Sequence, residues 1–584
     1  MRVLGIEGTA WCASAALHDT ETDTTYIESN PYEPESGGIH PREAAEHMAD
    51  AIPAVVDAAL STEHSDTTSS GIDAVAFSRG PGLGPCLRVV GTAARSLAGA
   101  LDVPLVGVNH MVAHLEVGRH RSGFENPVCL NASGANAHLL GYHDGRYRVL
   151  GETMDAGVGN AIDKFTRHVG WSHPGGPKVE AAAGDADGET LLGLPYVVKG
   201  MDFSFSGISS AANDAHDDGE PVEEICFALQ EHVFGMLTEV SERALSLTGA
   251  DELVLGGGVG QNDRLRTMLE TMCADRGATF HAPEPKYLRD NAGMIAILGA
   301  KMAAAGDTVP ISESSIDPNF RPDEVPVTWR NDPSSVIDGR SGRERPDGTA
   351  HGATEFRRDR RGAEAVVECV ASEDRSTAPS YVIKRRVPKR YRHPELDGSI
   401  RRDRTVSEAR LTSEARRAGV PSPLVYDVDV PETTLTLQYV GDRDLAADLA
   451  ETTERADAPA GERSKRWART VGEHLARLHR AGIVHGDPTT RNVRVGDGIA
   501  GSTRDEREAG RPESDVFLID FGLGYHTGHV EDHAMDLHVF EGSVTATATE
   551  PEPVVDAFES GYQGVGNEDV LERLRDVRGR GRYR

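Results

Sequence analysis

The sequence is poor in cysteine and has no paired cysteine motif. Its six cysteines form no C-x-x-C pair and follow no regular spacing. A disulfide framework or a cysteine zinc site needs paired or regularly spaced thiols, so neither is expected. Several of the thiols stand in apolar runs such as residues 127–130, which predicts small buried side chains in a reducing compartment. The six are Cys12, Cys86, Cys129, Cys226, Cys273 and Cys369.

Long apolar runs are also missing. No stretch has the length and hydrophobicity of a membrane span, and no charged start is followed by an apolar segment of a secretory signal. We therefore expect a cytoplasmic protein with no membrane partner.

Lysine is scarce, and the net charge is strongly negative. Only eight of the 61 basic residues are lysine, and the formal net charge is −32 at pH 7. One interpretation is a protein that avoids nucleic acid. The other is adaptation to molar salt, as in a halophilic archaeon, where an acidic surface keeps a protein soluble while salt screens its self-repulsion. The acidic residues are dispersed along the chain, which favours the second interpretation and leaves a nucleic-acid partner possible.

The length of 584 residues predicts two to four domains. Residues 1–324 alternate β-rich apolar runs, glycine turns and alanine-rich helical stretches, which is the α/β pattern. Examples of the β-rich runs are residues 2–6, 74–78, 105–108, 128–131 and 252–255. Residues 325–354 lack periodicity and are predicted to be a linker. A second α/β unit follows at 355–584, with a polar run at 496–514 that is typical of a loop insertion.

Three short glycine motifs follow predicted strands in the first unit. They are residues 5–9 (GIEGT), 133–136 (SGAN) and 256–262 (GGGVGQN). Glycine lets the backbone approach a phosphate and direct N–H groups at it. Each motif alone also fits a plain turn, but three in one domain favour nucleotide binding.

A second signal is a histidine pair with helical spacing. His110 and His114 stand four residues apart and would share one face of a helix. A zinc protease of the H-E-x-x-H type needs Glu after the first His, and Met111 occupies that place. Two histidines at this spacing are more often surface or packing residues than metal ligands, unless a third ligand joins them. Asp290, just before an apolar helical stretch, is the candidate third ligand.

Together these motifs resemble the universal tRNA N6-threonylcarbamoyladenosine transferase family, and more narrowly the archaeal and eukaryotic catalytic subunit of the KEOPS complex. The resemblance covers nearly all of residues 1–324. The motifs that carry it, in chain order, are 5–9 (GIEGT), 78–88 (SRGPGLGPCLR), 110–116 (HMVAHLE), 159–164 (GNAIDK), 173–177 (HPGGP), 202–207 (DFSFSG) and 290–291 (DN).

The resemblance implies a two-lobed actin-like fold of the heat-shock ATPase and sugar kinase type. It implies threonylcarbamoyl-AMP as donor, and N6 of the adenosine 3′ of the anticodon of tRNA as acceptor. One Fe²⁺, or Zn²⁺, would be held by His110, His114 and Asp290. The residues at donor-binding positions of the family are Asn131, Ala132, Ser133, Gly134, Ala135, Asp163, Gly176, Glu180 and Asn262.

One position departs from the family pattern. The family's phosphate loop begins with a tyrosine that is a metal ligand, and here Asn131 stands in its place. An amide oxygen is a weaker, neutral ligand. Either Asn131 coordinates the metal, or water or substrate fills the position, or the metal differs.

The second unit carries the ordered residues of phosphoryl transfer. Residues 485–492 (HGDPTTRN) have the spacing of a protein-kinase catalytic loop, with Asp487 as catalytic base and Asn492 as an Mg²⁺ ligand. Asp520 of a D-F-G motif would be the second Mg²⁺ ligand, and the ion would be held against the phosphates of ATP. Upstream, Lys384 fits the phosphate-binding lysine and Glu408 its ion-pair partner.

A glycine-rich loop is missing, and residues 361–365 (RGAEA) stand in its place. With the basic stretches 384–392 and 578–584, this resembles the small atypical serine/threonine kinase of KEOPS, the p53-related kinase family. In an acidic protein such basic stretches favour contact with the tRNA backbone, although charge-balancing surface is the plainer interpretation. Tyr391 and Arg392 could also serve the kinase site.

The leading hypothesis is thus a bifunctional transferase and kinase or ATPase that works with the other KEOPS subunits. One alternative is a protein kinase with an ATP-binding actin-like regulatory module and no transferase chemistry. Another is a scaffold whose second half only positions tRNA.

Overall fold

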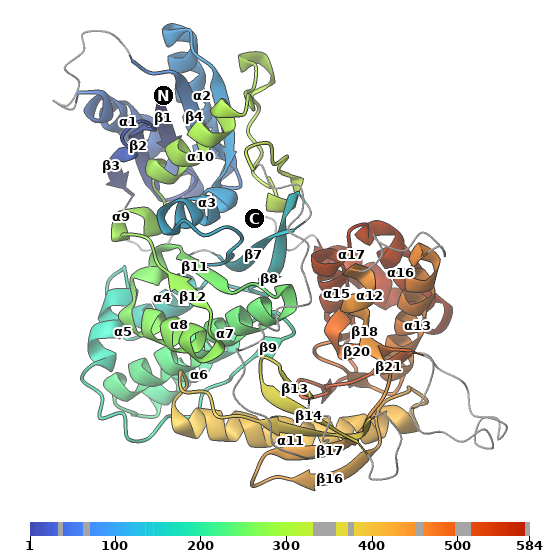
Figure 1. Ribbon diagram of the computed structural model, residues 1–584. Helices are drawn as coiled ribbons and strands as arrows, with labels where there is room; N and C mark the ends of the chain where they lie inside the picture. The colour runs from blue at the N-terminus through green and yellow to red at the C-terminus, as the bar shows by residue number, and fades with distance from the viewer. Residues whose placement is uncertain are drawn as a thin grey trace, which may run out of the picture.

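The computed structural model describes residues 1–32, 39–61, 71–134, 136–143, 145–330, 358–371, 379–450, 460–496 and 516–578. The predicted polar insertion after residue 496, most of the predicted linker, and all of the predicted basic stretch 578–584 except its first residue lie outside them. The described residues form two stacked α/β lobes in the N-terminal half and a third α/β part beside and below them (Figure 1). Within these residues, no helix combines the length and the apolar character that crossing a membrane requires.

The first lobe is built on a five-stranded sheet with the strand order β3-β2-β1-β4-β5. Helices α1 and α2 pack on one face of this sheet, and α10 packs on the other. The elements are β1 (Arg2–Glu7), β2 (Cys12–Asp19), β3 (Thr24–Pro31), α1 (Pro41–Leu60), β4 (Ala74–Gly80), α2 (Gly84–Leu101), β5 (Leu105–Asn109) and α10 (Ala292–Ala304).

The second lobe repeats this plan with the strand order β8-β7-β6-β11-β12. In both sheets three antiparallel strands are followed by two parallel ones. The strands are β6 (Val128–Ala132), β7 (Ala137–His143), β8 (Arg146–Glu152), β11 (Glu252–Gly256) and β12 (Thr279–His281), with the short pair β9 (Val198–Lys199) and β10 (Asp202–Phe203) beside them. The helices are α4 (Val158–His168), α5 (Gly176–Ala183), α6 (Ser206–Asp217), α7 (Val222–Thr248), η1 (Gly258–Gln261), α8 (Asp263–Arg276) and α9 (Pro285–Leu288).

Helix α3 (His110–Ser122) lies between the two lobes. It contacts β5 and α10 of the first lobe and β6 and β11 of the second. Because it is enclosed from both sides, its residues from His110 to Gly118 are all buried. The duplicated sheet and the helix between the lobes confirm the predicted actin-like class for the N-terminal half.

The C-terminal part has a sheet lobe and a helical lobe. The sheet has the order β13-β14-β15-β17-β16, and the long helix α11 packs on it. Its elements are β13 (Arg358–Arg361), β14 (Ala365–Ala371), β15 (Pro379–Arg386), α11 (Pro394–Arg417), β16 (Val425–Asp429) and β17 (Thr434–Gln438). This two-lobed plan agrees with the predicted kinase-like fold.

The helical lobe has its own apolar core, in which α13 packs against α16 and α15 against α17. Its elements are β18 (Arg443–Asp444), α12 (Leu445–Ala450), α13 (Ala460–Arg480), β19 (Ile483–Val484), η5 (Thr490–Asn492), β20 (Val493–Val495), β21 (Val516–Leu518), β22 (Tyr525–His526), α15 (Val530–Thr547), α16 (Pro551–Val565) and α17 (Glu568–Arg578).

The chain leaves the first lobe through η2 (Ile311–Glu313) and η3 (Pro322–Glu324). The next six residues remain packed on the N-terminal half: Val325 and Trp329 join the core around α3 and α10, and Trp329 stacks on Tyr147. The rest of the predicted linker lies outside the described residues, so the boundary at 324/325 stays a prediction.

Candidate active sites

The first candidate site is centred on the N-terminal end of α3. The side chain of Asn109 accepts hydrogen bonds from the N–H groups of Met111 and Val112, which caps the helix where β5 ends. This fixes the first turn of α3 at the carboxyl end of a parallel strand, where α/β sheets commonly place their sites. His110 and His114 project from this turn and the next, with their ring centroids 4.9 Å apart.

Asp290 joins the two histidines from the segment before α10. Its Oδ1 lies 3.3 Å from Nε2 of His110 and 3.3 Å from Nε2 of His114. Its Oδ2 accepts a hydrogen bond of 2.9 Å from Nε1 of Trp11. The structure therefore brings together the three predicted metal ligands, with one atom of each within 4.8 Å of the others.

The donor set fits a transition-metal ion. Both histidines present Nε2 to one carboxylate, and Nδ1 of His110 faces Oε2 of Glu7 at 3.2 Å. A carboxylate behind a metal-binding histidine fixes the ring and its tautomer. Two imidazoles and a carboxylate suit zinc or iron.

Glu7 is itself held in place. Its Oε1 accepts a 2.8 Å hydrogen bond from the N–H of Thr9, and its Oε2 also accepts the hydroxyl of Ser78. Burial lowers the pKa of His110, but the Glu7 and Asp290 carboxylates outweigh it and raise the pKa to about 10. Glu7 lies within the glycine motif 5–9, yet its role was not predicted, because nothing in the chain order pairs it with His110.

Asn131 lies at the end of β6, paired in register with Gly256 of β11 on one side and with His138 of β7 on the other. Its Nδ2 is 3.5 Å from Nε2 of His138. Burial lowers the pKa of His138 to about 3, so this ring is neutral and can accept the amide hydrogen. Within the described residues, Oδ1 of Asn131 and Nδ1 of His114 are buried without a hydrogen-bond partner. A buried carbonyl-type oxygen left in this state fits a site that is completed by a bound group.

The predicted donor-binding residues line two adjoining loops and helix ends. Gly134 accepts the N–H of Asn160 at 2.9 Å through its carbonyl, which seats α4 on the loop after β6. Ala132 is buried in β6, Ser133 hydrogen-bonds the carbonyl of Asn136, and Ala135 lies outside the described residues.

The polar members of this set already have structural partners. Asp163 accepts the N–H of Gly175 at 2.8 Å and faces His173, just before Gly176 opens α5. Glu180 accepts the N–H of Asp263 at 2.9 Å. Asn262 caps α8 through Oδ1 and donates to Gln230 through Nδ2. These contacts link α4 to the segment before α5, α5 to the start of α8, and the start of α8 to α7. A bound donor molecule would therefore share these side chains with the hydrogen bonds that they already make.

The second candidate site lies in the C-terminal part, between its two lobes. Nζ of Lys384 is 2.8 Å from Oε1 of Glu408 and 2.7 Å from Oδ1 of Asp520. Asn492 donates through Nδ2 to Oδ2 of Asp487 at 2.9 Å. The predicted lysine, glutamate, catalytic base and metal ligands thus converge from β15, α11, the loop between β19 and η5, η5 itself and the D-F-G segment.

The carboxylates of this site differ in their acidity. Burial raises the pKa of Asp487 to about 6, although the positive charge of Arg243 opposes this. Burial also acts on Asp520, but Lys384 and Arg386 outweigh it and hold the pKa of Asp520 well below its usual range. Asp520 has φ +66°, a left-handed backbone that is rare outside glycine and often found at functional sites.

The N-terminal half contributes a residue to this second site. Arg243, on α7, lies 2.9 Å from Oδ2 of Asp487 through Nη1, and it also binds Glu239 and Glu364. Glu364 belongs to the segment that replaces the glycine-rich loop. Arg243 was not predicted, since its partner is 244 positions away in the chain.

The predicted role of the basic stretch 384–392 is wrong for its buried members. Lys384, Lys389 and Arg392 are at most 8% exposed. Lys389 binds Glu242 at 2.6 Å, and Arg392 binds Glu239, so both fasten α7 to the C-terminal part and cannot reach a tRNA backbone. The hydroxyl of Tyr391 is 3.2 Å from Glu242, which places Tyr391 in this interface and not at the kinase site.

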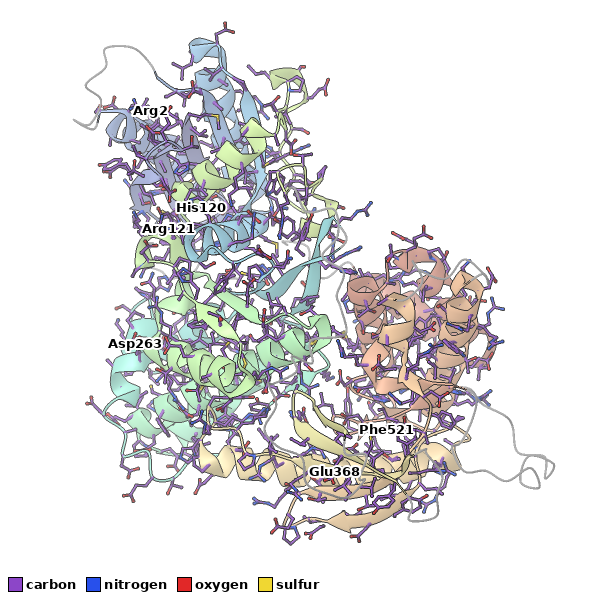
Figure 2. The ribbon with its side chains drawn as sticks, in the orientation of Figure 1. Arg2, His120, Arg121, Asp263, Glu368 and Phe521 are labelled. Carbon is purple, nitrogen blue, oxygen red and sulfur yellow. The ribbon has the colours of Figure 1, made fainter. Side chains whose placement is uncertain are left out.

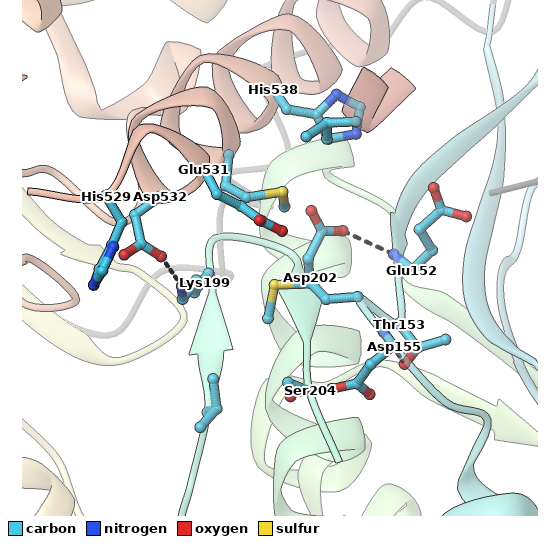
Figure 3. Close-up of a pocket in the computed structure, with 14 residues that line it drawn as sticks. Glu152, Thr153, Asp155, Lys199, Asp202, Ser204, His529, Glu531, Asp532 and His538 are labelled. Atoms are coloured by element: carbon cyan, nitrogen blue, oxygen red, sulfur yellow. Dashed lines mark hydrogen bonds and ion pairs between the residues drawn. The ribbon is translucent and has the colours of Figure 1, made fainter. Parts of the chain in front are cut away.

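A cavity of about 520 Å³ lies where the second lobe meets α15. Figure 3 shows Asp202 accepting the N–H of Glu152, and Lys199 paired with Asp532. Burial raises the pKa of Asp202 to about 7 and lowers that of His538 to about 4. None of the predicted site residues lines this cavity.

Comparison with known proteins agrees with the resemblance seen in the motifs. Residues 23–297 match the tRNA N6-adenosine threonylcarbamoyltransferase family.

Three similar proteins each carry the description "Probable bifunctional tRNA threonylcarbamoyladenosine biosynthesis protein". That of Haloquadratum walsbyi is 60% identical over 585 residues, which cover 100% of both chains. That of Halobacterium salinarum is 62% identical, covering 100% of this chain and 99% of its own. That of Methanospirillum hungatei is 45% identical with the same coverage.

Proposed function

The chain belongs to the family of bifunctional tRNA threonylcarbamoyladenosine biosynthesis proteins, and we propose that residues 1–324 transfer a threonylcarbamoyl group from threonylcarbamoyl-AMP to N6 of the adenosine 3′ of the anticodon. Residues 355–584 then form a second catalytic domain that uses ATP and Mg²⁺. The observation that carries the first half of the proposal is the convergence of His110, His114 and Asp290 at the end of α3 between the two lobes.

In the transfer, the adenosine N6 attacks the carbonyl carbon of the threonylcarbamoyl group. The new C–N bond forms, the C–O bond to the adenylate phosphate breaks, AMP leaves with the electron pair, and N6 loses a proton. A divalent ion, iron or zinc, held by His110, His114 and Asp290 would supply Lewis-acid polarisation in such a reaction.

The protein's own residues prepare this site. Glu7 orients His110 through Nδ1, and Trp11 orients Asp290 through Oδ2. Asn131, fixed by His138 through its amide nitrogen, keeps its oxygen available as a further weak ligand. The glycine loops after β6 and β11 would receive the adenylate, with Asp163, Gly176, Glu180 and Asn262 along their wall.

In the second domain, Lys384 and Glu408 form the ion pair that positions nucleotide phosphates in kinases. Asn492 and Asp520 would hold Mg²⁺, and Asp487 would accept the proton of the attacking hydroxyl or water. The intact set supports ATP turnover over a purely structural role. A kinase with a non-catalytic actin-like module is disfavoured, since it leaves the assembled His110, His114 and Asp290 group without a use.

The test uses the full-length protein with threonylcarbamoyl-AMP, unmodified tRNA and the remaining KEOPS subunits in high salt. We expect threonylcarbamoyladenosine in the digested tRNA, detected by mass spectrometry. The variant His110→Ala should lose both product and about one bound metal ion per chain, whereas His168→Ala, a surface histidine paired with Asp217, should keep both. Product formation by His110→Ala with unchanged metal content would overturn the site assignment.

The second domain is tested separately with Asp487→Asn. This variant should lose ATP hydrolysis and autophosphorylation while its thermal unfolding remains cooperative. Unchanged phosphate release would exclude Asp487 as the base.

A further inference from the structure

A second group of metal-ligand side chains lies in the first lobe, apart from the site at the start of α3. His18 is on β2, Asp23 is in the turn between β2 and β3, and His120 is in the last turn of α3. One ligand atom from each lies within 4.8 Å of the others. Figure 2 labels His120 beside Arg121 on this helix.

The distances suit a shared ion. Nε2 of His120 is 2.7 Å from Oδ1 of Asp23, and the rings of His18 and His120 are 6.0 Å apart at 89°. Two ligands with bonds of 2.0–2.1 Å to a tetrahedral ion are about 3.3 Å apart. This spacing is longer than the 2.7 Å contact of His120 with Asp23 and shorter than the 4.8 Å within which all three ligand atoms lie. The side chain of Asp23 is 55% exposed and that of His120 is 25% exposed, so both can rotate to meet that spacing.

Outer contacts orient two of the three ligands. Nδ1 of His18 is 2.9 Å from the hydroxyl of Thr25. When this hydroxyl accepts the hydrogen of Nδ1, Nε2 of His18 carries no hydrogen and is free to coordinate a metal ion. Oδ2 of Asp23 is 3.4 Å from Nη1 of Arg121, which leaves Oδ1 facing His120. The charge of Arg121 is in turn paired with Glu284 at 2.7 Å. Hydrogen bonds to the far side of a ligand are the usual means of fixing a metal site.

A comparison inside the chain separates this group from an ordinary ion pair. His168 and Asp217 form a contact of similar length, 2.8 Å, and the ring of His216 is 5.8 Å from that of His168. Across the described residues, however, these side chains do not meet as a group of three ligand atoms, whereas His18, Asp23 and His120 do. His18 is also only 3% exposed, so one of the three side chains of the group is buried.

We propose that His18, Asp23 and His120 bind a divalent transition-metal ion, with Zn²⁺ the best match to two imidazoles and one carboxylate. A water molecule would occupy the fourth coordination position of the ion. The ion ties the hairpin of β2 and β3 to the last turn of α3, whose first turns carry His110 and His114. It therefore braces the helix on which the first site is built.

The experiment measures zinc bound per chain in the full-length protein. The protein is stripped with a chelator, saturated with Zn²⁺ and freed of unbound zinc by desalting before elemental analysis. We expect His120→Ala to retain about one zinc per chain fewer than the natural sequence. Asp23→Asn, a change at an exposed side chain that keeps its size, should show the same loss.

His168→Ala is the matched control and should retain the natural zinc content. Combining His120→Ala with His110→Ala should remove a further equivalent, which separates this group from the first site. Equal zinc content in His120→Ala, Asp23→Asn and the natural sequence would overturn the proposal. Loss in all variants including His168→Ala would also overturn it, because binding would then be a nonspecific surface effect.

A second readout is independent of stoichiometry. Zn²⁺ stabilises whatever folded state it binds, so it should raise the melting temperature of the His110→Ala protein and not that of the His110→Ala, His120→Ala double variant. Equal shifts in the two proteins would contradict the site.

Discussion

The guanidinium of Arg243, on α7 of the N-terminal half, lies 2.9 Å from Oδ2 of Asp487, the proposed base of the C-terminal domain. Both side chains are mostly buried, at 9% and 12% exposed. The same Oδ2 also accepts the amide of Asn492. A residue of the N-terminal half therefore contacts the proposed base of the C-terminal domain, and the pKa of Asp487 depends on the contact between the two halves.

Replacing Arg243 should shift the pH dependence of ATP turnover. Burial raises the pKa of Asp487 to about 6, and Arg243 lowers it from an even higher value. A base must be deprotonated to work, so removing the positive charge should move the acidic limb of the rate profile to higher pH. The measurement is kcat for ATP hydrolysis by Arg243→Gln between pH 5 and 9.

Arg404 provides the control for this variant. It binds the same two carboxylates, Glu239 and Glu364, at 2.9 and 2.7 Å, and the structure gives it no contact with Asp487. Arg404→Gln should loosen the same interface while leaving the acidic limb in place. Identical profiles for the two variants would mean that Arg243 acts only on packing.

Glu7 should tune metal binding at the first site without being a ligand. Its Oε2 faces Nδ1 of His110 at 3.2 Å, on the side of the ring away from Asp290. Loss of such an outer partner typically weakens metal affinity by about 10–100-fold. We expect this range for Glu7→Gln in a chelator competition assay. The surface change Glu46→Gln, at a side chain 65% exposed, should leave affinity unchanged, and equal affinities would argue against the role of Glu7.

Five strands of the N-terminal half could be predicted from the sequence. The apolar runs at 2–6, 74–78, 105–108, 128–131 and 252–255 are β1, β4, β5, β6 and β11. Each of the five has a parallel neighbour in its sheet, and strands buried on both faces of such sheets have nearly continuous apolar sequences. The convergence of the proposed ligands His110, His114 and Asp290 could also be predicted, because the two histidines have helical spacing and the family's motif order includes Asp290.

The interface between the halves could not be predicted. Glu239 and Glu242 on α7 have the pattern of a solvent-exposed helix face, yet both are buried against Arg392, Arg404 and Lys389. Their partners lie about 150 positions later, and local periodicity carries no information at that range. For the same reason Arg243 was not predicted, and the basic stretch 384–392 was interpreted as a surface for nucleic acid.

Asp202 should make stability depend on pH. Its pKa is raised by burial to about 7 from the ordinary 3.8, so the folded state binds its proton more tightly than the unfolded state does. The stability that this proton provides is full below about pH 4 and is lost as the pH rises through 7. Asp202→Asn keeps the acceptor for the N–H of Glu152 and needs no proton.

We therefore expect Asp202→Asn to be more stable than the natural sequence at pH 8, by about 1–3 kcal/mol, and similar to it at pH 4. Denaturant unfolding at the two pH values measures this. The exposed change Asp218→Asn, at the end of α6, should have no pH-dependent effect. A constant difference between Asp202→Asn and the natural protein at both pH values would refute the titration of Asp202.

Lys389 and Arg390 are adjacent in sequence and should differ sharply in their importance to the interface. Nζ of Lys389 binds Glu242 at 2.6 Å with both side chains at most 7% exposed, whereas Arg390 is 70% exposed in its pair with Asp275. Breaking a buried ion pair leaves an uncompensated charge and costs about 3–5 kcal/mol, whereas solvent screens an exposed pair, so its loss matters little. In calorimetry, Lys389→Met should separate the unfolding of the two halves into two transitions, and Arg390→Met should not. Coincident transitions in both variants would mean that the remaining contacts of α7, including Arg243 to Asp487, suffice to couple the two enzymes.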